Sequence, residues 1–86
     1  MAKYRVQISA TAERQLRRLP HDDQVRVVRA VLALAQDPRP SGCRKLQGYD
    51  DVFRIRVGTY RVIYSVEGRQ LLVIILKVGH RKDVYR

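Results

Sequence analysis

The sequence predicts an α+β fold in which an N-terminal strand and a helical hairpin precede a three-stranded antiparallel meander. Three observations support this prediction. Apolar and polar residues alternate over residues 4–9 and 52–66, as in strands with one buried face. Apolar residues recur at helical spacing from residue 12 to residue 35. Residues 71–78 are mostly apolar on both faces, as expected of an interior strand.

These elements predict a four-stranded mixed sheet of order 1-4-3-2, with strands counted along the chain and strand 1 parallel to strand 4. The right-handed crossover rule places both helices on one face of the sheet. A chain of 86 residues is long enough for a single domain, residues 1–86, with one modest core.

The first strand and the first helix follow from residues 4–19. Tyr4 to Ser9 forms the strand, and either Ser9 or Thr11 can cap a helix that runs to about Leu19. The inner side of this helix is expected to carry three residues spaced i, i+4 and i+7: Ala12, Leu16 and Leu19.

A second helix is expected after a break at Pro20-His21, with Asp22 as its cap and an end before Asp37-Pro38. Its buried stripe is predicted to consist of five aliphatic residues: Val25, Val28, Val31, Leu32 and Ala35. Residues 37–51 then form the longest irregular stretch, because prolines and glycines interrupt it. This stretch is either a plain connector or a functional loop, anchored to the core by Leu46.

The segment VFRIRVGTYRVIYSV, residues 52–66, reads as two strands joined by a two-residue turn at Gly58-Thr59. Glycine at the first turn position suits a type II′ turn, which places Arg56 opposite Arg61. Alternation then puts one set of apolar side chains on a common face: Phe53, Ile55, Val57, Tyr60, Val62 and Tyr64. Arg54, Arg56 and Arg61 fall on the other face. The strand after the next turn, at Glu67-Gly68, is expected to end at Gly79.

Two arginines directly across a strand pair repel each other, and such pairs destabilise a sheet. An anion that bridges Arg56 and Arg61 would offset this repulsion, and guanidinium groups fit phosphate oxygens well. The alternative is a solvated face on which the two side chains splay apart in water.

The composition is strongly basic, with 18 Lys and Arg against 8 Asp and Glu and a net charge of +10. Such a balance favours a polyanionic partner, either a nucleic acid or an acidic protein. The single Cys43 excludes an intramolecular disulfide, and with two distant histidines it leaves no zinc set, so no metal or cofactor is expected. The N-terminus is not a signal peptide and no apolar run approaches the ~20 residues that span a bilayer. A cytoplasmic protein without membrane contact is therefore expected.

Conventional catalytic sets are missing from the sequence. There is no Ser/His/Asp or Cys/His arrangement, and the acidic pairs Asp22-Asp23 and Asp50-Asp51 lie where carboxylates cap helices or turns. The remaining candidates are cationic or aromatic: Arg54, Arg56, Arg61, Lys77, His80, Arg81, Lys82, Tyr85 and Arg86. If the last strand pairs with the strand that holds Arg61, then His80, Arg81 and Tyr85 can line the same concavity. The alternative is a solvated tail with an edge-strand tyrosine.

Three segments carry a resemblance to a known family: KLQG at 45–48, FRIRVGTYRVIY at 53–64 and VGHRKDVYR at 78–86. They resemble the RelE-like toxins of the RelE/ParE superfamily, and the resemblance covers nearly the whole chain. It implies the toxin of a type II toxin–antitoxin pair that cuts mRNA in the ribosomal A site. It also implies a cognate RelB-like antitoxin, acidic and partly disordered, that silences the toxin.

The resemblance further implies roles for single residues. Arg61 matches the arginine that stabilises the scissile phosphate, and Arg81 matches the one proposed to protonate the leaving 5′ oxygen. Tyr85 matches the tyrosine that stacks on or orients the nucleotide at the cut. Further RNA contacts are expected from five cations: Arg54, Lys45, Lys77, Lys82 and Arg86.

Arg54 and Arg56 depart from the family, because well-studied relatives have lysines at these positions. Arginine does not deprotonate in proteins, so these residues are expected to bind phosphate and not to act as bases. His80 is the expected substitute proton acceptor. The implied reaction is metal-independent attack of an RNA 2′-OH on its own phosphorus. The alternative function is that of a ParE-like protein that poisons DNA gyrase without cutting nucleic acid.

Overall fold

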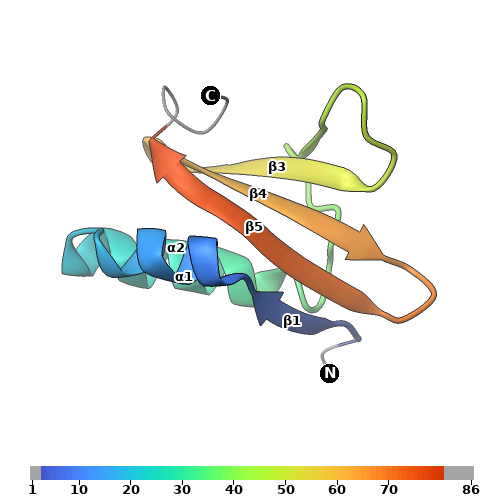
Figure 1. Cartoon of the computed structure of the whole chain (residues 1–86), viewed down its shortest axis with the longest axis horizontal. Helices are drawn as coiled ribbons and strands as arrows, with labels where there is room; N and C mark the ends of the chain where they lie inside the picture. The colour runs from blue at the N-terminus through green and yellow to red at the C-terminus, as the bar shows by residue number, and fades with distance from the viewer. Residues whose placement is uncertain (1–2, 81–86) are drawn as a thin grey trace.

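Two helices cover one face of a mixed five-stranded sheet in the computed structural model, which describes residues 3–80 (Figure 1). The elements run in the order β1 (Arg5–Ile8), α1 (Ala10–Arg17), α2 (His21–Ala33), β2 (Arg44–Lys45), β3 (Val52–Val57), β4 (Tyr60–Glu67) and β5 (Leu72–His80). The strand order is β1-β5-β4-β3-β2, with β1 parallel to β5 and every other pair antiparallel. Neither helix of the described residues is long and apolar enough to cross a membrane.

The predicted α+β class and the order of the four long strands are confirmed, but the sheet has one strand more than expected. The extra strand is β2, which pairs with β3 at the edge of the sheet. Because β2 contains only two residues between proline- and glycine-rich segments, it shows no alternation that would reveal it in the sequence. The segment 37–51 is therefore not wholly irregular.

Ser9 caps the first helix, which confirms the first of the two predicted caps, Ser9 and Thr11. Its side chain accepts a hydrogen bond from the Ala12 amide at 3.1 Å, while Thr11 lies inside the helix. Ala12 and Leu16 are buried as predicted. The helix ends at Arg17, shortly before the predicted end at Leu19.

The start of α2 differs from the prediction. Pro20 is the residue at the cap position and makes no side-chain hydrogen bond, and the helix begins at His21. Asp22 was expected to be the cap but lies in the first turn with Asp23. Both carboxylates stabilise the helix by interacting with the positive N-terminal end of its dipole. Because acidic residues are favourable throughout the first turn, Asp22 alone does not identify the cap position.

The buried side of α2 also differs from the prediction. Val27, Val31 and Leu34 are nearly inaccessible to solvent, whereas Leu32 is 60% exposed and Val25 37% exposed. Val31 and the partly buried Val28 belong to both the predicted and the observed stripe. The sequence was ambiguous because aliphatic residues lie on more than one side of this helix, so two stripes of similar strength compete.

The central hairpin has the predicted register, with Val57 opposite Tyr60 and Arg56 opposite Arg61. Gly58 has φ +61° and Thr59 has no positive φ, as a type II′ turn requires. The next strand runs beyond its expected end, because Gly79 remains in β5 opposite Arg61.

A β-bulge interrupts the pairing of β4 with β5 between Ile63 and Tyr64. Ile63 faces Lys77 but Tyr64 faces Ile75, so Leu76 has no counterpart. Side chains of α1 bind the backbone here. The Ser9 hydroxyl donates to the Leu76 carbonyl at 3.0 Å, and the Val78 amide donates to Gln15 Oε1 at 2.7 Å. Helix α1 therefore satisfies polar groups around the irregular pair.

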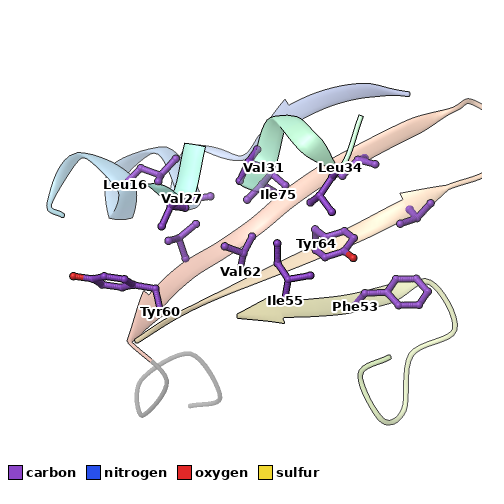
Figure 2. Close-up of a cluster of buried hydrophobic side chains, with 14 residues drawn as sticks. Leu16, Val27, Val31, Leu34, Phe53, Ile55, Tyr60, Val62, Tyr64 and Ile75 are labelled. Carbon is purple, nitrogen blue, oxygen red and sulfur yellow. The ribbon is translucent and has the colours of Figure 1, made fainter. Parts of the chain in front are cut away.

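The hydrophobic core fills the space between the helices and the sheet. Figure 2 shows this cluster, with Tyr60 toward one end and Phe53 toward the other. The fully buried Tyr64 donates its hydroxyl to the Pro38 carbonyl at 2.7 Å, which ties the segment after α2 to the core. Cys43 packs against the core in this segment. Leu46, the predicted anchor, is only partly buried and is not among the residues of the cluster.

The observed orientation of α2 predicts different costs for the same substitution at two positions. Val27→Ala should lower the free energy of unfolding by about 2 kcal/mol, because it removes two methyl groups from a closed site. Val25→Ala, the matched control, should cost well under half as much, since both changes have the same effect on helix propensity. Urea denaturation measures both, and equal costs would contradict the orientation described here.

Candidate functional site

The cationic side chains of the hairpin lie on the sheet face opposite the helices. Tyr60, Val62 and Tyr64 belong to the core under the helices, so strand alternation turns Arg61 and Ile63 to the other side. Residues directly opposite each other on neighbouring strands lie on the same face of the sheet, so the cations that pair with Arg61, Ile63 or Arg54 lie on this face as well. We call this surface the arginine face, and it carries Arg44, Arg54, Arg56, Arg61 and Lys77.

Arg61 is the most enclosed cation of the arginine face. It is only 9% exposed, beside the buried Ile63, whereas its partner Arg56 is exposed and Arg54 is half-buried. Across β5 its neighbour is Gly79, which contributes no side chain. A guanidinium in such a low-dielectric setting interacts more strongly with an anion than one in open water. The predicted pair of Arg56 and Arg61 is therefore an exposed cation beside an enclosed one.

The register places one predicted site residue, Lys45, apart from the arginine face and adds Arg44 to that face. Lys45 was expected to bind RNA, but it pairs with Phe53 and so lies on the helix side of the sheet. Arg44 pairs with Arg54 and lies on the arginine face. Sequence reasoning missed Arg44 because β2 gave no periodic signal that would assign its residues to a face.

A polar hollow of about 360 Å³ lies at this edge of the arginine face. Gly42, Arg44, Arg54 and Arg56 line it. A side chain at Gly42 would meet nothing within 4 Å, so the hollow is open on that side. It is lined mainly by guanidinium-bearing residues, which suits a ligand rich in anionic oxygens. Lys77, predicted to bind RNA, faces Ile63 in the same cross-strand row as Arg54.

The structure separates His80 from this surface. His80 pairs with Tyr60, and the centroids of the two rings lie 4.8 Å apart. Because Tyr60 belongs to the core face, His80 lies on the helix side, so the expectation that it lines a concavity with Arg54 and Arg56 is wrong. The expectation rested on the last strand lying beside the strand that holds Arg61, which is correct, but strand pairing alone does not decide the face on which His80 lies. The remaining predicted residues, Arg81, Lys82, Tyr85 and Arg86, lie outside the described residues.

Tyr60 joins the hairpin to the start of α2. Its hydroxyl donates to Asp23 Oδ2 at 2.9 Å, and Arg26 Nη1 lies 3.9 Å from Asp23 Oδ1. The hydrogen bond to Asp23 raises the pKa of Tyr60 above the ordinary value of 10.0, with further contributions from burial and from the negative charge. This contact braces the strand next to Arg61, and the spacing of the two residues in sequence gave no hint of it.

Within residues 3–80, no cluster of three or more His, Cys, Asp or Glu side chains could hold a metal ion.

The described residues thus form a small basic α+β domain with arginines on the sheet face opposite the helices. A family model described as the ParE toxin of type II toxin–antitoxin systems (parDE) matches residues 6–85. The toxin RelG of Mycobacterium tuberculosis is 34% identical over 84 residues, covering 96% of this chain and 97% of RelG. Toxin RelE of the same organism is 32% identical over 84 residues, covering 96% of this chain and 87% of that toxin.

Solved structures agree with these sequence relatives. The archaeal RelE–RelB complex from Pyrococcus horikoshii has a TM-score of 0.83 and 33% identity, covering 95% of this chain and 99% of that one. The RelBE2 toxin–antitoxin complex from Mycobacterium tuberculosis has a TM-score of 0.81 and 32% identity, covering 92% and 99%. The chain therefore belongs to the RelE/ParE family of type II toxin–antitoxin toxins and is RelE-like.

The contact between Tyr60 and Asp23 predicts a titration effect. Asp23→Asn removes the negative charge that holds the tyrosine proton, so the pKa of Tyr60 should fall toward 10.0. A raised folded-state pKa stabilises the fold below the unfolded value, and this stabilisation is lost as the pH rises through the folded value. Below pH 10 the Asp23→Asn variant should therefore have a lower free energy of unfolding than the wild-type chain, and this difference should shrink as the pH rises through the raised pKa of Tyr60.

Tyrosine ring-carbon NMR across an alkaline titration measures this pKa directly. Asp22→Asn is the matched control, since it removes a neighbouring carboxylate for which the structure records no contact with Tyr60. An equal shift in both variants would mean that general charge, and not the hydrogen bond, controls Tyr60.

Proposed function

We propose that this protein is a ribosome-dependent mRNA endoribonuclease that inhibits translation by cutting mRNA in the ribosomal A site. The observation that carries the proposal is the pairing of Arg56 with the enclosed Arg61 on the sheet face opposite the two helices. Two guanidinium groups across a strand pair suit a phosphate with two anionic oxygens. The named relatives RelG and RelE support the same assignment.

In the proposed reaction the 2′-OH of the RNA attacks the adjacent phosphorus and the bond to the 5′ oxygen of the next nucleotide breaks. The products are a 2′,3′-cyclic phosphate and a 5′-OH. The proton of the 2′-OH goes to solvent or to a group of the ribosomal complex, and the leaving 5′ oxygen takes up a proton from solvent while Arg81 stabilises its negative charge. Arg61 and Arg56 stabilise the charge that develops on the non-bridging oxygens, and Tyr85 orients the nucleotide.

His80 is left out of the proposed proton transfer, because its ring lies against Tyr60 on the helix side. The described cations of the arginine face include four arginines, which do not act as bases at neutral pH. General acid–base catalysis contributes roughly 10²–10⁴-fold, whereas in-line orientation of the reacting groups can supply ~7–11 kcal/mol. Cleavage therefore depends on a second macromolecule that holds the attacking 2′-OH in line with the leaving oxygen. We propose that the ribosome does this in the cytoplasm.

A cognate antitoxin is the second proposed partner. The solved relatives from Pyrococcus horikoshii and Mycobacterium tuberculosis are complexes with antitoxins. A RelB-like, acidic and partly disordered chain suits a net charge of +10 and can fold as it binds. An apolar groove of about 480 Å³ between α2 and β3, lined in part by Ala33, Leu34 and Ile55, fits apolar side chains of such a chain.

A ParE-like gyrase poison is the second candidate function, and the description of the matching family model favours it. It would use the same basic face to contact DNA or gyrase without breaking a phosphodiester bond. Translation in a cell-free extract and supercoiling by purified gyrase separate the two candidates. Inhibition of supercoiling without inhibition of translation would replace the nuclease assignment.

The proposed roles predict the effect of two arginine substitutions. Arg61→Ala and Arg81→Ala should each lower the rate of mRNA cleavage on the ribosome about 10²–10³-fold, because each removes stabilisation of developing charge. Both should abolish growth arrest while antitoxin binding persists. Arg69→Ala, in the turn at the far end of β4, removes the same charge and should leave cleavage unchanged. Full toxicity of Arg61→Ala would contradict the proposal.

The shortage of proton-transfer groups predicts a dependence on the ribosome. Purified protein should cut mRNA in programmed ribosomes and leave the same mRNA intact in free solution over the same time. Primer extension on both samples maps the cuts. Comparable cleavage of naked mRNA would show that the chain itself supplies the orientation and the base.

A further inference from the structure

We propose that Arg44 and Arg54 form a second phosphate subsite, so that the arginine face binds two consecutive phosphates of one RNA strand. The scissile phosphate lies at Arg56 and Arg61, and its neighbour lies in the hollow at Arg44. This inference rests on the proposed function, because it describes how the same RNA substrate is held. It assigns a role to Arg44, which the sequence pattern did not mark.

The geometry places two arginine pairs side by side. Arg44 faces Arg54 across β2 and β3, and Arg56 faces Arg61 across β3 and β4. Arg54 and Arg56 are two residues apart on the same side of β3, which separates them by about 6.8 Å along the strand. Neighbouring strands lie about 4.8 Å apart, so the centres of the two pairs are about 8 Å apart along a diagonal of the sheet. Flexible arginine side chains reach successive phosphates of an extended strand from such positions.

Each pair places two guanidinium groups directly opposite each other. A phosphate fits such a pair, since a guanidinium fork binds two phosphate oxygens. The hollow of about 360 Å³ lined by Arg44, Arg54 and Arg56 provides room for one phosphate group, and Gly42 leaves its rim open.

The backbone that carries Arg44 is held in place at several points. Tyr64 donates to the Pro38 carbonyl at 2.7 Å, and the Cys43 amide donates to the Pro40 carbonyl at 3.0 Å. Beyond β2, the Leu46 amide donates to the Val52 carbonyl at 2.8 Å. Arg44 therefore projects from a fixed edge strand and not from a loose connector, as a specific contact requires.

Lys45 provides a matched control for Arg44. The two residues are neighbours in the sequence and carry the same charge, but the register places Lys45 on the helix side opposite Phe53. If Arg44 acts only through long-range attraction, removal of either charge has the same effect. If Arg44 binds a particular phosphate, only its own removal changes the contact.

Calorimetric titration of the full-length chain with 2′-O-methyl oligonucleotides tests the subsite, because these RNAs lack the attacking hydroxyl and stay intact. One oligonucleotide carries a single phosphodiester and the other carries two, and neither has a terminal phosphate. The wild-type chain should bind the longer one about five- to tenfold more tightly. Arg44→Ala should abolish this gain and reduce the slope of log K against log salt by about 0.7, the value for one contact with a single strand. Lys45→Ala should preserve both.

Equal effects of Arg44→Ala and Lys45→Ala would overturn the subsite, as would an undiminished gain in Arg44→Ala or no gain in the wild-type chain. Circular dichroism and thermal melting check that each variant is folded, and Arg44→Gln, which keeps most of the side-chain length, replaces the alanine variant if it is not. Cleavage on the ribosome is measured in parallel with the wild-type chain. Cleavage without a length-dependent gain would refute the subsite alone, whereas absence of cleavage would refute the proposed function.

Discussion

The two-residue turn at Gly58 and Thr59 controls the chemistry of the whole sheet. A strand exchanges its two faces when its register shifts by one residue, so the turn decides which side chains of β3 and β4 meet. Here it pairs Val57 with Tyr60 and therefore Arg56 with Arg61. Six apolar residues of the hairpin then face the core, namely Phe53, Ile55, Val57, Tyr60, Val62 and Tyr64, and the arginines collect on the opposite face. Core formation and the proposed binding of an anion thus depend on the same local geometry.

One face of the sheet forms the hydrophobic core, and the other carries the cations to which we assign the function. On the helix side, aromatic rings and aliphatic residues close the core, and Tyr60 and Tyr64 reach beyond it to bind Asp23 and Pro38. On the other side, cations occupy neighbouring positions that repel each other. The first arrangement holds the second in place, because rigid strands keep the guanidinium groups near one another before any ligand arrives.

The long periodic elements could be predicted from the sequence, and so could the arginine pair. Alternation and the glycine turn were enough to place Arg56 opposite Arg61, because hairpin pairing is local. The buried side of α2 could be predicted only in part, for Val28 and Val31, since its aliphatic residues form two competing stripes and only packing against the sheet selects one. Arg44 was missed for another reason, because a two-residue strand has no period. The position of His80 depended on a bulge, which a regular alternation cannot reveal.

That bulge links the first helix to the far end of the chain. Leu76 adds one residue to β5, so Val73 and Ile75 before it and Val78 after it all reach the core despite an odd spacing. Ser9, the N-cap of α1, and Gln15 within α1 bind the backbone at this point. Without the extra residue, Lys77 would turn into the core and His80 would turn toward the arginines. Ser9 and Gln15 thus bind β5 at the point where its side chains change faces. Helix α1 and its cap therefore help to determine which residues of β5 lie on the arginine face, although the helix lies on the other side of the sheet.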